Sequence, residues 1–63
     1  MSNTIEMLAA ALVADPEKAS AFFDGALSAE RIREAYPIER MMKLLHGLEA
    51  RGVLKRELLR NGV

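Results

Sequence analysis

Apolar residues recur at helical spacing in this chain, and each such stretch is bounded by a proline or a glycine. The first stretch places five of them at positions i, i+3, i+4, i+7 and i+8: Ile5, Leu8, Ala9, Leu12 and Val13. This spacing predicts one apolar helix face. Asp15-Pro16 then ends the helix, because the residue before proline is driven out of the helical region, while proline suits the first turn of the next helix. The chain is thereby restricted to short helices.

The first helix is expected over residues 4–14, with Asn3 and Glu6 spaced as a capping box at its start. A second apolar stripe follows proline 16: Ala19, Phe22, Phe23, Ala26 and Leu27. Its two phenylalanines are expected to anchor the core. We expect this helix to end near Asp24 with Gly25 as its C-terminal cap, because glycine in a helix interior costs about 1 kcal/mol relative to alanine.

Two further helices are expected in the second half. Ser28 is a suitable N-cap for a helix over Ala29–Tyr36. The longest helix is expected from Pro37 to about Arg51, with the stripe Ile38, Met41, Met42, Leu45 and Leu48.

Gly52 interrupts that stripe and leaves two alternatives for the tail. Val53–Leu58 is compatible with a short strand, and Leu54–Arg60 with a final helix capped by Asn61-Gly62. The content of Leu, Lys, Arg and Glu favours the helix.

Size and composition predict one all-α domain of four to five short helices over residues 1–63. A 63-residue chain buries only about 60% of the surface that its unfolded state exposes. Such chains usually gain stability from disulfides, a metal or a second subunit. The chain has no Cys and one His, so we expect a homodimer. We recognise no secretion signal and no apolar run of about 20 residues, which predicts a cytoplasmic protein without membrane contact.

Charge is unevenly distributed along the chain. Residues 1–30 carry one Lys and five acidic residues, whereas residues 31–63 carry eight Lys or Arg and four acidic residues. The formal net charge of zero is therefore the sum of about −4 in residues 1–30 and about +4 in residues 31–63. This division indicates a regulatory or binding protein.

A helix-turn-helix pattern is visible from Leu27 to Arg56. A short helix, a tight turn at Tyr36-Pro37 and a second helix are followed by the ending LLHGLEARGVLKR, whose matching residues are Leu44, Leu45, Leu48, Glu49, Arg51, Gly52 and Val53. This half of the chain resembles helix-turn-helix and winged-helix regulators. The resemblance implies a helix-turn-helix core, and a first wing strand after Gly52.

Catalysis, a cofactor and a small-molecule substrate are not expected. His46 is the only histidine and has no Cys or grouped carboxylates that would complete a metal site. Neither a serine beside a base nor a Gly-rich phosphate loop is recognised.

Two binding functions remain, and we favour a protein partner. The chain has more large apolar residues than a small helical monomer readily covers, including Met7, and methionine suits adaptable binding surfaces. We expect the partner to be a larger regulatory or motor protein that this chain inhibits or restrains. Its expected contacts are Met41, Met42, Leu54, Leu58 and Leu59. Small Cys-free chains of this kind are common among phage and mobile-element products.

The alternative is a DNA-binding transcriptional regulator. Its contacts would be Arg33, Arg40, Lys43, Arg51, Lys55 and Arg56. Glu39 on the same helix face disfavours it, as does the lack of Ser, Thr, Asn and Gln from Ala29 to Arg60, because these residues supply many phosphate and base contacts.

Overall fold

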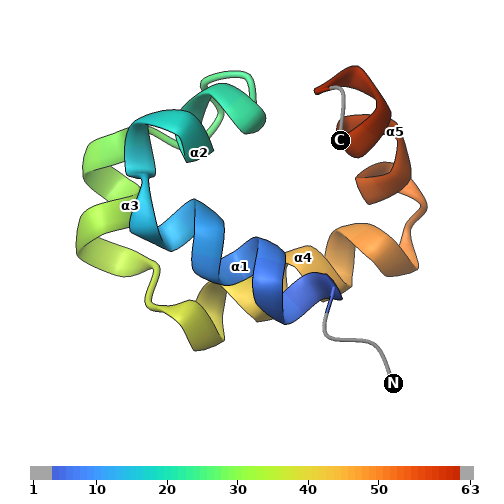
Figure 1. The fold of residues 1–63 in the computed structure, drawn as a ribbon, viewed down its shortest axis with the longest axis horizontal. Helices are drawn as coiled ribbons and strands as arrows, with labels where there is room; N and C mark the ends of the chain where they lie inside the picture. The colour runs from blue at the N-terminus through green and yellow to red at the C-terminus, as the bar shows by residue number, and fades with distance from the viewer. Residues whose placement is uncertain (1–3, 62–63) are drawn as a thin grey trace.

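The computed structural model describes residues 4–61, and within this range the chain is entirely helical apart from turns (Figure 1). Its five helices are α1 (Thr4–Ala14), α2 (Pro16–Phe22), α3 (Ala29–Ala35), α4 (Ile38–Ala50) and α5 (Val53–Arg60). The expected all-α fold of four to five short helices is therefore confirmed, and the bounds of α1 are those expected from the sequence.

The helix starts are determined by local hydrogen bonds. An Oδ1 atom of Asp15 accepts a bond of 3.2 Å from the backbone N–H of Lys18, and Pro16 occupies the first turn of α2. Ser28 Oγ accepts a bond of 3.1 Å from the N–H of Arg31 and caps α3 as expected. These caps satisfy amide groups that the first turn of a helix leaves unpaired. The capping box predicted at Asn3 lies outside the described residues.

The turn after α2 begins earlier than expected. The helix ends at Phe22, because Asp24 already has a left-handed backbone with φ 58° and Gly25 follows with φ 81°. The Gly25 N–H donates to the Ser20 carbonyl at 2.8 Å, which satisfies a carbonyl at the end of α2. Gly25 therefore acts in the C-terminal cap as predicted, with Asp24 sharing the left-handed conformation.

The core lies where α1 crosses α4 and where α2 meets α3. Its buried side chains are Ile5, Ala9, Leu12, Ala19, Phe22, Ile32, Met41, Leu45 and Leu54. Phe22 anchors the core as predicted. Phe23 packs at its margin, edge-on to Phe22 with ring centroids 5.0 Å apart.

The tail after α4 is a helix, so the strand alternative for Val53–Leu58 is wrong. α4 continues through Gly47 to Ala50, and the left-handed Gly52 with φ 77° redirects the chain into α5. Leu54 of α5 is buried in the core, which holds the helix against α4. α5 therefore stands where the resemblance to winged helices implies a strand. Of the predicted Asn61-Gly62 cap, Gly62 lies outside the described residues.

The helix pair of the predicted helix-turn-helix is present as α3, the Tyr36-Pro37 connection and α4. α3 packs on α2, whereas α4 packs on α1 and α5. The resemblance itself remains a prediction.

The end of α5 returns to α2 and partly closes the ring of helices seen in Figure 1. Arg60 Nη2 donates to the Phe22 carbonyl at 2.7 Å, and Arg60 also forms an ion pair with Glu57. The hydrogen bond to Glu57 raises the pKa of Arg60 above its ordinary value. Arg60 therefore links the C-terminal helix to the first half of the chain. Within residues 4–61, none of the helices is both long and apolar enough to cross a lipid bilayer.

Candidate protein-binding surface

The five residues predicted to contact a partner fall into three environments. Met41 and Leu54 are 0% and 5% exposed, so both belong to the core, and Leu54 also lines the hollow described below. They are buried because their helix faces are covered by neighbouring helices. Met42 is half-buried against the core, Leu58 is half-buried beside α1, and Leu59 is exposed.

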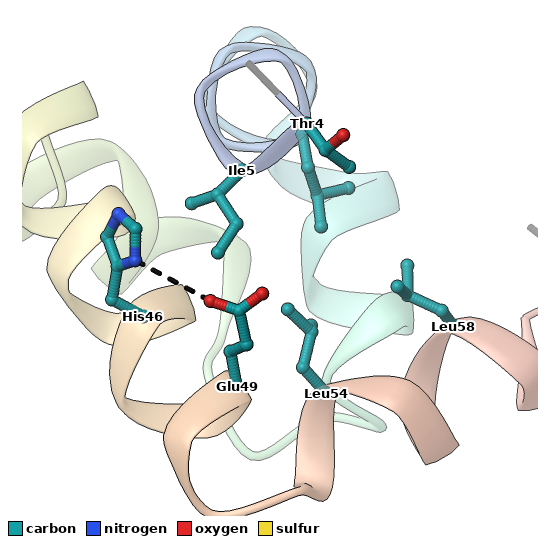
Figure 2. Close-up of a pocket in the computed structure, with 7 residues that line it drawn as sticks. Thr4, Ile5, His46, Glu49, Leu54 and Leu58 are labelled. Carbon is teal, nitrogen blue, oxygen red and sulfur yellow. Dashed lines mark ion pairs between the residues drawn. The ribbon is translucent and has the colours of Figure 1, made fainter. Parts of the chain in front are cut away.

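Leu58 lines an apolar hollow between α1, the end of α4 and α5 (Figure 2). The hollow has a volume of about 160 Å³. Its lining residues are Thr4, Ile5, Leu8, His46, Glu49, Leu54 and Leu58. In Figure 2, Leu54 and Leu58 on α5 lie across the hollow from Ile5 and Thr4 on α1. Residues of α1, α4 and α5 thus form its walls.

Two further hollows share residues with this one. A hollow of about 370 Å³ shares Glu49, Leu54 and Leu58 and adds Gly52 and Lys55. A hollow of about 480 Å³ shares Leu8, and its other lining residues are Ala11, Leu12, Lys18, Ala21, Phe22 and Asn61. We call the three together the α1–α5 groove. The first hollow adjoins the second through residues of α4 and α5 and adjoins the third through Leu8 of α1.

Two polar residues that line the first hollow, His46 and Glu49, lie close to each other. His46 Nδ1 lies 3.8 Å from Glu49 Oε1, an ion pair when the imidazole is protonated. At the two ends the groove presents ammonium groups, that of Lys55 on α5 and that of Lys18 on α2. Both lysines are exposed, and neither forms an ion pair with another residue of the described chain. The groove therefore offers apolar walls between two cations.

The six basic residues of the DNA-binding alternative divide into two groups. Arg33 is paired with Glu17 at 3.0 Å, and Arg40 donates to the Ala35 carbonyl at 3.2 Å while lying 4.8 Å from the centroid of the Tyr36 ring. The other four are exposed and form no ion pair within residues 4–61: Lys43, Arg51, Lys55 and Arg56. Arg51, Lys55 and Arg56 flank the turn at Gly52, so the free cations are concentrated near the α4–α5 corner.

The α1 wall of the groove is absent from the residues predicted from the sequence. Nine of the eleven residues of α1 are apolar, and Glu6 is its only charged residue. Only part of this surface is covered, because Met7, Ala10, Ala11 and Ala14 remain exposed. A helix that is apolar on all sides usually has partners on all sides. This composition was the sequence signal that could have identified α1 as part of a binding surface.

Comparison of the chain with protein-family models, curated proteins and solved structures finds no match. The case for a binding surface therefore rests on the geometry and charge of the chain itself.

Proposed function

We propose that this chain is a small, non-enzymatic regulatory protein of the cytoplasm that binds a larger protein and inhibits or restrains it. The α1–α5 groove is the observation that carries this proposal. Leu8 and Leu58 lie only half-buried in its walls, so a partner side chain placed between them would remove apolar surface from water. Such burial is worth about 25 cal/mol per Å² of apolar surface.

An amphipathic helix of the partner is the occupant that fits this groove. Helices dock in apolar grooves through large apolar side chains at i, i+3, i+4 and i+7. α1 is about 16 Å long at 1.5 Å per residue, which matches roughly three turns of a docked helix. Lys18 and Lys55 lie at the ends of the groove, so acidic residues flanking the apolar stripe would find unpaired cations.

The test requires capture of the partner at a defined position, followed by a binding measurement. A photo-crosslinking residue at Leu58 should capture the partner, whereas the same residue at Ala26 should not, because Ala26 is exposed and lines none of the three hollows. Calorimetry with the purified partner should then show a loss of affinity for Leu58→Asp and little change for Ala26→Asp. Far-UV circular dichroism of both variants checks that the helices remain.

Two outcomes would reject the groove as the binding site. One is equal affinity of the Leu58→Asp and Ala26→Asp variants for the captured protein. The other is recovery of nucleic acid alone from the Leu58 crosslink.

DNA binding is the second candidate, and the four unpaired cations Lys43, Arg51, Lys55 and Arg56 are the observation that favours it. Neutralising about four phosphates gives a slope of roughly −3.6 in log affinity against log salt. Affinity for duplex DNA would then fall on the order of 100-fold between about 50 and 200 mM salt. A groove contact made by leucines should change little over that range. A gel-shift assay that finds no duplex binding at about 50 mM salt would exclude this second function.

A further inference from the structure

Two large apolar side chains are strongly exposed, and the groove accounts for neither. Met7 of α1 is 70% exposed and Leu59 of α5 is 69% exposed. Neither residue lines any of the three hollows of the groove. One comes from the acidic half of the sequence and the other from the basic half. A single exposed leucine is ordinary on a protein surface, but here each exposed side chain belongs to a larger exposed flank of its helix.

The two flanks are complementary in chemistry. The outer flank of α1 consists of exposed residues outside the groove, of which one is acidic and the rest are apolar: Glu6, Met7, Ala10 and Ala14. The outer flank of α5 has one large apolar residue among exposed cations: Lys55, Arg56 and Leu59. Lys55 also lines the groove, whereas Arg56 lines none of the three hollows and forms no ion pair among the described residues, so Arg56 remains available to Glu6 of another molecule.

We propose that two copies of the chain form a two-fold dimer in which the outer flank of α1 packs on the outer flank of α5 of the other copy. In a two-fold interface each contact occurs twice. Met7 of each copy therefore meets Leu59 of the other copy, and Glu6 of each copy lies near Arg56 of the other copy. The alanines of α1 allow the helices to approach to about 8 Å, the short end of the usual range of interaxial distances.

Charge and size both favour a second copy as the occupant of these flanks. The arrangement brings the one carboxylate of the α1 flank, Glu6, against the cationic flank of α5 in the other copy. A standard interface buries about 800 Å² per partner, roughly a fifth of the 4331 Å² that this chain exposes. Each copy contributes two helix flanks to the interface. The apolar surface buried there adds to the small core of a domain of this size.

Sedimentation equilibrium of the full chain between about 1 and 500 µM tests the dimer. The wild type should dimerise, and Met7→Asp or Leu59→Asp should raise the dimer dissociation constant by at least about 100-fold, since each removes two apolar contacts per dimer. Ala26→Asp adds the same charge at another exposed site and should leave the dimer intact. Met7→Gln and Leu59→Lys repeat the test, and circular dichroism verifies the fold of each variant.

A charge exchange tests the orientation of the two helices. Glu6→Lys and Arg56→Glu should each weaken the dimer, and the double variant should recover most of the lost affinity. Lys43→Glu, an equal charge change on the exposed side of α4, should have little effect. The proposal is overturned by a wild type that stays monomeric at about 500 µM, by aspartate variants that dimerise like the wild type, or by a double variant weaker than both single variants.

The dimer proposal and the groove proposal can be refuted independently of each other. Leu58→Asp should remain dimeric because Leu58 lies in the groove, whereas Met7→Asp should be monomeric and still bind the partner protein. A Met7→Asp variant that stays dimeric overturns the dimer proposal and leaves the groove proposal unaffected.

Discussion

The position of α5, and with it one wall of the groove, depends on the left-handed backbone of Gly52. Its φ of 77° is a conformation that side-chain-bearing residues adopt at a cost of about 1–2 kcal/mol. A Cβ atom built on Gly52 meets no other atom within 4 Å. Gly52→Ala should therefore destabilise the fold through the backbone alone, by about 1–2 kcal/mol.

Gly47 supplies the matched control. It lies inside α4, and a Cβ atom there also meets nothing within 4 Å. Because Gly47 has a helical backbone, Gly47→Ala should stabilise the protein by about 0.5–1 kcal/mol. The same chemical change thus has opposite expected signs at two positions five residues apart.

Thermal unfolding followed by circular dichroism, at one fixed protein concentration, measures both effects. A domain of this length has a total stability of roughly 3–9 kcal/mol, and 1 kcal/mol shifts its Tm by about 4–8 °C. Gly52→Ala should lower the Tm by roughly 4–16 °C, and Gly47→Ala should raise it by roughly 2–8 °C. A neutral or stabilising Gly52→Ala, or a destabilising Gly47→Ala, would refute the argument.

Three other substitutions probe the core, a cap and the link between α5 and α2. Leu45→Ala removes a fully buried side chain and should cost about 2–5 kcal/mol in urea unfolding; a loss below 1 kcal/mol would contradict its place in the core. Ser28→Ala removes the cap of α3 and should cost about 1 kcal/mol, which an unchanged urea midpoint would disprove. Arg60→Met removes the bond to the Phe22 carbonyl and should speed hydrogen exchange in α5 more than in α4. Equal exchange rates in the variant and the wild type would show that this bond does not hold α5.

Helix positions and caps were predictable from the sequence because they depend on residues close together in the chain. The Ser28 cap involves a residue three positions away, and the breaks at Pro16 and Gly52 follow from backbone restrictions of single residues. The tail left two alternatives because its apolar residues do not continue the stripe of the preceding helix and Gly52-Val53 is compatible with the start of a strand. In the structure this segment is a helix, and its residue Leu54 is buried in the core.

The tertiary structure decided which apolar and basic side chains are available to a partner. Periodicity placed Met41 and Met42 on one stripe, but in the structure Met41 is buried in the core and Met42 is only partly buried. Leu58 and Leu59 are neighbours in sequence, yet one lines the groove and the other faces solvent. Arg33 is engaged by Glu17, sixteen residues away. The sequence by itself determined where the helices lie, because that depends on local backbone preferences. Which side chains are exposed depended on which helix packs over which face, because those packing contacts join residues far apart in the chain.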